Sequence, residues 1–496
     1  MPETRFSKWQ GFHGRNLAAL AVILSCSMLL PQCESGGLGA RDFIKVSQNG
    51  FDASDNAEDI NSYAWAMRYF RAEGAENGYV YVGTGNNIAG LIGFYFGTLI
   101  AGGEITDAPV RPPEIRRHRP DLGPEVWERV FDYRDVENEG EYLTTGFRFM
   151  GIYHAAVDPA KNDVRADYLY VATQGLESRL WRSRTGDPGS WESVFTTGEG
   201  GASIRYFAEH NGKMYLAYAY DTYEDEPPPG EIWVSSDGVN FSPLMQNGFG
   251  NPNNRGIEFL ISYNDWLYAG TKNDKEGYEI WKLEGPDKNG AIKVVDHGAT
   301  DTRNEIAGTP CIFKGQLYVG SIIFFGFNPA QASGFKGCDI IRINEQDEWE
   351  TVVGPQSLSG YESGFNFFTN SYCWWMEEHD GWLYAGTWDQ GTVLSWLLDN
   401  LPALISYIQT GEQSGDVPDL PLDYDQWYWL TDAGADIFKT QDGVNWFPVT
   451  INGMGDRTNY GWRTMESTPD GYLYLGSANP VDGLEIWRSL EPAATQ

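Results

Sequence analysis

The chain has 496 residues, of which 41% are hydrophobic and 15% aromatic, and its formal net charge is −34 at pH 7. This composition excludes a disordered chain, because it supplies enough apolar surface for a large core. The 69 acidic against 35 basic residues argue against general nucleic-acid binding, because phosphate recognition needs a basic surface.

The chain begins with a segment that has the composition of a signal peptide, residues 1–33, in which basic residues precede the apolar run 17–30. That run is too short for a membrane-spanning helix. The polar, flexible segment 34–41 follows Cys33, so the end of the signal also resembles a lipoprotein signal in which Cys33 or Cys26 carries the lipid. We therefore expect an exported protein, either lipid-anchored in a bacterial cell envelope or freely extracellular.

After residue 42 a four-stranded unit recurs. Its clearest copy, residues 205–244, has Asn-Gly and Asp-Gly turns between short strands with period-two patterning, which is typical of β-hairpins. The second strand of the unit recurs at 79–84, 168–173, 213–218, 266–271, 316–321, 382–387 and 472–477. The repeat predicts that residues 42–490 form one all-β domain, a seven-bladed β-propeller of four-stranded antiparallel blades.

The last unit, 459–488, has three strands, and we predict that residues 43–47 add the fourth and close the ring. The spacing of the repeats predicts insertions at 86–124 in blade one and 391–430 in blade six. Each insertion contains an apolar run, at 88–103 and at 392–408. One interpretation is that these runs pack over their own blades; the other is a surface for a partner or a lipid.

A propeller usually binds its ligand at the axis, where the innermost strand of each blade lies. Polar and aromatic side chains recur on those strands, and the predicted axial residues are Arg68, Arg148, Arg205, Glu258, Trp374, Trp462 and Arg463. Arginine pairs with carboxylates and aromatic rings stack on sugars, which predicts a site for an acidic sugar or another anion. The alternative is structural: the arginines join neighbouring blades through buried carboxylates, and the tryptophans belong to the core.

Two turns carry a family resemblance. They contain Ser235, Asp237, Gly238 and Phe241 in one copy, and Thr440, Asp442, Gly443 and Trp446 in the other. These turns resemble the Asp-box (BNR-like) propellers, which include sialidases and many non-catalytic binding proteins, although here the glycine follows the aspartate directly. In that family the box is structural, so the resemblance implies no catalytic role for these turns. No motif fixes a nucleophile or a general acid, and no catalytic residue is assigned.

Metal and cofactor binding have little support in the sequence, because the six histidines lack metal-site spacing. An acidic stretch contains Asp416, Asp419, Asp423 and Asp425; we interpret it as a solvated loop, with Ca²⁺ binding as the alternative. His154 and His210 follow inner-strand arginines, but His210 and His379 occupy similar turns, which favours turn chemistry on the surface over catalysis.

Three cysteines remain after signal removal, Cys311, Cys338 and Cys373, and their pairing cannot be deduced from spacing. Cys311 and Cys373 are one candidate pair, because they fall on inner strands of adjacent blades. The first functional interpretation is an exported, non-catalytic propeller that recognises an extracellular glycan or a protein partner. The alternative is a glycan-active enzyme, a hydrolase or lyase, that acts on acidic sugars at the same axis.

Overall fold

The structure is a computed structural model. It describes residues 36–51, 61–86, 111–136, 144–161, 164–175, 177–198, 202–220, 227–284, 290–323, 336–392 and 433–493. The chain divides into two compact units, Met1–Gly37 and Leu38–Gln496, and all the described strands lie in the second. The predicted signal peptide with Cys26 and Cys33, the apolar runs 88–103 and 393–408, and the aspartates between 416 and 425 lie outside the described residues.

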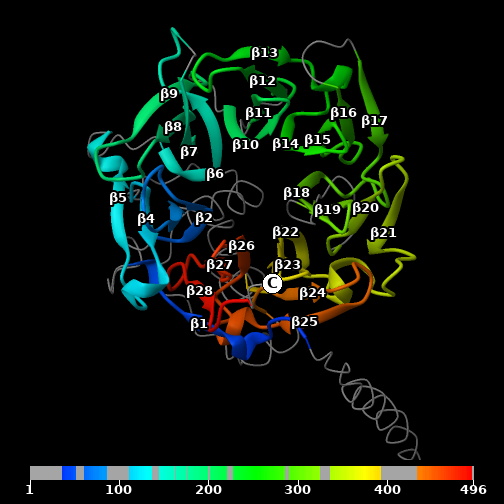
Figure 1. Ribbon diagram of the computed structural model, residues 1–496. Helices are drawn as coiled ribbons and strands as arrows, with labels where there is room; N and C mark the ends of the chain where they lie inside the picture. The colour runs from blue at the N-terminus through cyan, green and yellow to red at the C-terminus, as the bar shows by residue number, and fades with distance from the viewer. Residues whose placement is uncertain are drawn as a thin grey trace, which may run out of the picture. The chain divides into compact units, whose positions relative to one another are not determined.

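Antiparallel pairing joins the described strands into groups of four, which we call blades one to seven in chain order (Figure 1). Blades one and two contain β2 (Tyr63–Phe70), β3 (Tyr79–Gly85), β4 (Glu114–His118), β5 (Glu128–Asp132), and β6 (Thr144–Ala156), β7 (Arg165–Gly175), β8 (Arg179–Ser183), β9 (Glu192–Thr196). Blades three and four contain β10 (Ala202–His210), β11 (Lys213–Tyr220), β12 (Glu231–Ser235), β13 (Ser242–Met245), and β14 (Gly256–Tyr263), β15 (Trp266–Lys272), β16 (Ile280–Leu283), β17 (Ala291–Val295).

Blades five and six contain β18 (Ile306–Phe313), β19 (Gln316–Ile322), β20 (Ile340–Ile343), β21 (Trp349–Val353), and β22 (Asn370–His379), β23 (Trp382–Asp389), β24 (Ile437–Thr440), β25 (Trp446–Thr450). Blade seven contains β26 (Gly461–Ser467), β27 (Leu473–Ala478), β28 (Ile486–Ser489) and β1 (Phe43–Lys45). Short 3-10 turns connect some strands, namely η1 (Ala40–Asp42), η2 (Asn49–Phe51), η4 (Pro120–Leu122), η5 (Tyr133–Asp135), η6 (Gly248–Gly250), η7 (Ser363–Asn366) and η8 (Gly453–Gly455). The fold is the all-β antiparallel propeller that the repeats predict.

The first strand of each blade contacts the first strand of the next, and β26 contacts β2, so these inner strands surround a common axis. The ring closes as predicted, because β1 pairs antiparallel with β28, with Phe43 opposite Ser489 and Lys45 opposite Trp487. This pairing joins the N-terminal strand to the C-terminal blade and covers a sheet edge that would otherwise be exposed.

The predicted insertion of blade one is shorter than the sequence indicated. Residues 114–118, which the spacing assigned to the insertion 86–124, form β4 and pair with β3, with Tyr81 opposite Arg117. The run of arginines and prolines therefore contains the third strand of the blade. The sequence did not predict this strand, because a run rich in arginine is unusual for a buried strand. The contacts that neutralise these arginines form only in the folded chain.

The second strand of every blade carries a buried tyrosine. These tyrosines, each at most 1% exposed, are Tyr81, Tyr170, Tyr215, Tyr268, Tyr318, Tyr384 and Tyr474. Two of them donate a hydrogen bond to a glycine of the next blade: Tyr170 Oη to Gly238 O (3.1 Å) and Tyr318 Oη to Gly443 O (3.4 Å). Both glycines have φ near +80° and any Cβ there would collide with the tyrosine hydroxyl, so these turns require glycine.

The same two turns are held by an aspartate. Asp237 Oδ1 accepts hydrogen bonds from the backbone of Val239 (2.8 Å) and Asn240 (2.7 Å). Asp442 repeats this pattern with its own following residues, Val444 and Asn445. The side chains predicted to be structural, Asp237 and Asp442, thus close the turns against a neighbouring blade.

A second repeated device links consecutive blades, and we call it the asparagine latch. An asparagine before the inner strand donates Nδ2 hydrogen bonds to a glycine carbonyl of the preceding loop and to a buried acid just before or at the start of the third strand. The asparagine–acid pairs are Asn61–Glu114 (2.6 Å), Asn254–Glu279 (2.6 Å), Asn304–Asp339 (2.9 Å), Asn370–Asp436 (2.6 Å) and Asn459–Glu485 (2.6 Å).

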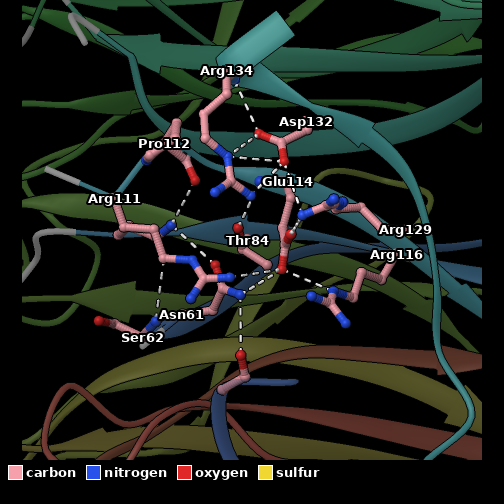
Figure 2. A network of polar contacts seen from close by, with 12 residues as sticks. Asn61, Ser62, Thr84, Arg111, Pro112, Glu114, Arg116, Arg129, Asp132 and Arg134 are labelled. Carbon is pink, nitrogen blue, oxygen red and sulfur yellow. Dashed lines mark hydrogen bonds and ion pairs between the residues drawn. The ribbon is translucent and has the colours of Figure 1, made fainter. Parts of the chain in front are cut away.

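In blade one the latch acid is also neutralised by arginines. Glu114 is 1% exposed and forms ion pairs with Arg111 (3.4 Å), Arg116 (2.8 Å) and Arg129 (3.7 Å), as Figure 2 shows. A buried carboxylate is costly unless its lone pairs are matched. The arginines of the run 111–119 therefore have structural partners in this blade.

Candidate anion site at the propeller axis

Every inner strand contains a β-bulge at the same level. In six strands the extra residue is Trp65, Arg148, Arg205, Glu258, Trp374 or Arg463; in β18 the irregularity spans Gly308 and Thr309. A bulge leaves one residue unpaired and redirects its side chain, and bulges are enriched beside functional sites. The recurring bulge explains why charged residues sit on otherwise apolar inner strands.

The six bulge side chains meet in neighbouring pairs. The Arg148 guanidinium lies over the Trp65 ring, with its carbon 5.1 Å from the ring centroid. Across the next blade boundary, Arg205 Nε lies 3.6 Å from Glu258 Oε2. We call these six residues the bulge ring.

The third pair places the Arg463 guanidinium 5.4 Å from the ring centroid of Trp374, and Trp375 lies on the same arginine at 5.8 Å. Arginine over tryptophan is a favourable cation–π arrangement, but it supplies no counter-charge. Since the bulge ring contains three arginines and one glutamate, its side chains carry two more positive than negative charges.

Arg463 contributes one of these two charges. It is 7% exposed, makes no ion pair within the described residues, and its Nε has no hydrogen-bond partner there. Burial first, and then the charges of Arg148 and Arg205, lower the pKa of Arg463 well below its usual value. Arginine remains a cation at neutral pH even so, and a buried, unmatched cation is energetically costly.

Aromatic side chains border the ring on blades one, six and seven. The Tyr63 ring lies edge-on to Trp65 (centroids 5.9 Å apart) and to Trp374 (5.8 Å), and Tyr460 lies 5.9 Å away. Burial raises the pKa of Tyr63 well above its usual value, so its hydroxyl stays protonated near neutral pH. Tyr63 is therefore a hydrogen-bond donor and not a base.

Two of the predicted axial residues do not belong to the ring. Trp462 precedes the bulge, is fully buried, and donates its Nε1 hydrogen bond to Ala435 O (3.0 Å), so it is a core residue. Arg68 lies three residues beyond the bulge and pairs with Glu466 at 3.4 Å. The charge of Glu466 raises the pKa of Arg68, which makes this arginine the structural kind that the alternative interpretation expected.

The sequence missed Trp65 and Tyr63. Both belong to the segment NSYxWxM, which blades one and six share, with Trp374 at the position of Trp65. That repeated segment could have indicated that Trp65 occupies the same position in blade one as Trp374 in blade six. The bulge obscured it, because an extra residue shifts the side-chain alternation by one position.

A second layer of charge lies three residues beyond the ring. Arg68, Glu377 and Glu466 occupy equivalent positions, opposite Tyr81, Tyr384 and Tyr474. Each glutamate accepts a backbone hydrogen bond from the next inner strand: Glu466 from Tyr69 N (2.9 Å) and Glu377 from Ser467 N (3.3 Å).

Burial, followed by the neighbouring charge of Glu466, raises the pKa of Glu377 to about 8. The pKa of Glu466 is also raised, again first by burial. Both shifts favour a shared proton on this pair of carboxyls, which avoids two buried negative charges side by side.

The turn histidines differ from the prediction. His210 (2% exposed) and His379 (3%) are buried, and each Nδ1 lies within hydrogen-bond distance of a serine of the next blade, Ser262 (2.8 Å) and Ser467 (2.9 Å). Burial lowers the pKa of both histidines, so they stay neutral. The predicted solvated turn is wrong, because the turn packs against the neighbouring inner strand. His154, in contrast, is exposed and pairs with Asp167.

The three described cysteines are free, so the candidate pair Cys311–Cys373 does not form in this structure. Across the described ranges, no group of three or more histidine, cysteine, aspartate or glutamate side chains is arranged to hold a metal ion. Within the same ranges no helix has the length and apolar character needed to cross a bilayer.

The chain is structurally similar to other β-propellers. The WD40 propeller domain of Doa1 matches 90% of this chain and 97% of its own at 9% identity and a TM-score of 0.42. A thermostable family-43 glycoside hydrolase matches 60% and 91% at 12% identity (TM-score 0.30), and the Penicillium chrysogenum α-L-arabinanase complexed with arabinobiose matches 70% and 93% at 11% (TM-score 0.37).

Puromycin hydrolase also matches, over 89% of this chain and 55% of that one, at 10% identity and a TM-score of 0.44. No family profile matches the sequence, and no curated protein matches it. Likenesses at this level do not bear on the ligand or the reaction. They are compatible with a binding protein and with an enzyme alike.

Proposed function

We propose that this chain is an exported, non-catalytic binding propeller that recognises an acidic group of an extracellular glycan or protein partner at the bulge ring. The observation that carries the proposal is Arg463, a buried cation beside Arg148 and Arg205 that forms no ion pair with any residue the structure describes. An anionic group at this point supplies the missing counter-charge and accepts hydrogen bonds from guanidinium donors.

The ring contains arginine and tryptophan side by side, the combination expected for an acidic sugar. Its position on bulges of rigid strands favours a preorganised site, since little conformational entropy is lost on binding. The resemblance of the turns at 237 and 442 to Asp-box propellers supports an extracellular role. The composition of residues 1–41 supports export, with lipid attachment at Cys33 or Cys26 as the anchored form.

The second candidate function is a glycan-active enzyme at the same axis. Glu377 favours it, because a carboxyl with a pKa of about 8 is protonated at neutral pH and has the proton needed for general-acid catalysis. Against it, Glu377 and Glu466 bind neighbouring backbone and Arg68, which explains their burial structurally.

The experiment that tests the proposal is calorimetric titration of the mature protein with oligogalacturonate, N-acetylneuraminate and neutral cello-oligosaccharides. We expect an acidic probe to bind and Arg463→Met to weaken that binding by at least about tenfold, the effect of losing one charge-assisted contact. The matched control is Arg184→Met, an arginine that is 48% exposed and paired with Glu73.

Equal affinity of the wild type and Arg463→Met for every acidic probe would reject the ring as the site. Mass spectrometry of the titrated mixtures separates the two functions. New oligosaccharide products that disappear in Glu377→Gln would establish the enzyme, whereas unchanged probes that remain bound support the binding protein.

A further inference from the structure

A pocket of about 480 Å³ lies away from the inner strands, between the outer parts of blades one and two. Its lining includes the aromatic side chains Phe131, Trp181 and Trp191 and the charged side chains Arg129, Asp132 and Asp135. The volume falls within the range of small-ligand sites, which combine apolar walls with a few polar groups.

The pocket lies beside blade two, which lacks a buried acid that the other six blades share. In six blades a buried acid, at most 9% exposed, stands just before or at the start of the third strand: Glu114, Glu231, Glu279, Asp339, Asp436 and Glu485. Blade two has Arg179 at this position, paired with Glu177 (2.8 Å).

Because blade two has Arg179 in place of the acid, its tryptophan lacks the hydrogen-bond acceptor found in other blades. In blades three, four and seven the tryptophan two residues after the acid donates Nε1 to it: Trp233 to Glu231, Trp281 to Glu279 and Trp487 to Glu485. The equivalent Trp181 has no acceptor within the described residues, although it is only 8% exposed. A buried indole N–H without a partner costs stability, so its retention in the pocket wall needs a reason.

The aromatic side chains form a continuous wall. Phe131 lies 5.0 Å from Trp181 and 5.8 Å from Trp191, measured between ring centroids. Trp191 is half-buried, and its Nε1 also lacks a partner among the described residues. Flat aromatic faces of this kind bind the C–H face of a sugar ring.

The charged side chains that line the pocket do not favour an acidic ligand. Arg129 is already paired with Asp132 (3.0 Å) and lies 3.7 Å from Glu114, as Figure 2 shows. Asp135 is exposed and makes no ion pair or hydrogen bond within the described part of the chain. Asp132 is also paired with Arg134 (2.6 Å), so both arginines beside the pocket already have a carboxylate partner, whereas Asp135 adds a negative charge of its own. This arrangement disfavours a carboxylate ligand and favours hydroxyl groups that donate hydrogen bonds.

We propose that this pocket is a second binding site, distinct from the bulge ring, and that it takes a neutral pyranose unit of a glycan. The sugar ring packs on Trp191 and Phe131, and its hydroxyls donate to Asp135. The site is independent of the proposed axial function, because no bulge-ring residue lines it.

The test uses protein labelled with ¹⁵N at tryptophan and follows the indole N–H signals during titration. The probes are methyl β-D-glucopyranoside, methyl β-D-galactopyranoside and methyl α-D-mannopyranoside, with methyl β-D-glucuronide as the acidic counterpart. Trp181→Phe and Trp191→Phe assign the two signals. We expect at least one neutral glycoside to shift both signals saturably, and the glucuronide to bind at least several-fold more weakly.

Two variants separate binding from folding. Asp135→Asn changes an exposed side chain and should weaken binding about tenfold with no change in thermal unfolding, since one charged hydrogen bond is lost. Trp191→Ala should abolish the shift of the remaining Trp181 signal. The proposal is overturned if none of the three neutral glycosides shifts these signals, if Asp135→Asn binds as well as the wild type, or if Arg463→Met removes the response.

Discussion

The asparagine latches and the bulge ring both bury charge, yet they treat it differently. Each latch acid is surrounded by donors: Glu485 accepts from Asn459 Nδ2 (2.6 Å), Trp487 Nε1 (2.9 Å) and Lys45 Nζ (2.9 Å). In the ring, Arg463 has aromatic neighbours but no counter-ion within the described residues. The latch acids are therefore structural, and the unmatched cation of the ring is the basis of our proposal that a ligand binds there.

The strongest test of this contrast removes a latch acid. Glu485→Ala removes the acceptor of the buried Asn459 amide, of the half-buried Trp487 indole and of the exposed Lys45 ammonium, and we expect it to lower the free energy of unfolding by about 3–5 kcal/mol. Urea unfolding measures the loss. The control is Glu350→Ala, because Glu350 is 55% exposed in its pair with Arg342, and its removal should cost less than about 1 kcal/mol. Similar losses for both variants would contradict a special role of the latch.

The next test replaces the unmatched cation. Arg463→Met keeps much of the side-chain volume and removes the buried charge, so we expect the protein to be as stable as the wild type or about 1–4 kcal/mol more stable. Arg205→Met is the matched variant in the same ring, and it should destabilise because Glu258 loses its partner. The contrast fails if Arg463→Met destabilises as much as Arg205→Met in urea unfolding.

A smaller effect concerns the second charged layer. Glu377 has a folded pKa of about 8, above its unfolded value, so the folded state binds the extra proton between roughly pH 4.5 and 8. Stability should therefore fall as pH rises through this window. Glu377→Gln, which cannot ionise, should unfold at a higher temperature than the wild type at pH 8.5 and at a similar temperature at pH 5. An unchanged difference between the two pH values would reject the shifted pKa.

The smallest expected effect comes from the buried histidines. Burial lowers the pKa of His379 in the folded state, whereas the unfolded chain takes up a proton near pH 6.5. Stability should fall as pH drops below about 6.5. His379→Gln should reduce this fall in thermal melts by a few degrees, and His154→Gln, on an exposed residue, should leave it unchanged. Equal acid sensitivity of all three proteins would contradict the assignment.

Much of the fold was predictable from local patterns. The repeated strand around Tyr170 and its equivalents, and the Asp-Gly turns at 237 and 442, are set by period-two alternation and turn chemistry, which need no distant contact. The closing strand at Phe43 was predictable for a related reason, because a three-stranded last blade leaves an edge that a spare strand can cover.

The sequence predicted that arginine and tryptophan side chains lie near the axis, but it did not predict correctly which individual residues lie on the bulges. Of the predicted axial residues, Arg148, Arg205, Glu258, Trp374 and Arg463 lie on the bulges, whereas Trp462 lies in the core and Arg68 pairs with Glu466. The sequence did not single out Trp65, which also lies on a bulge. A bulge inserts one residue, so the side that a given residue faces depends on strand pairing across the blade and not on its place in the sequence.

By itself, the sequence determined the repeat, the strand order, the antiparallel pairing and the acidic, aromatic character of the chain. Tertiary structure alone decided which polar and charged groups have partners. Glu114 pairs with three arginines, and His379 lies within hydrogen-bond distance of a serine of the next blade, whereas Arg463 has none of the described carboxylates close enough to pair. The physical reason is distance. Alternation and turns act between near neighbours in the chain, whereas the cost of a buried charge depends on groups that folding brings from other blades.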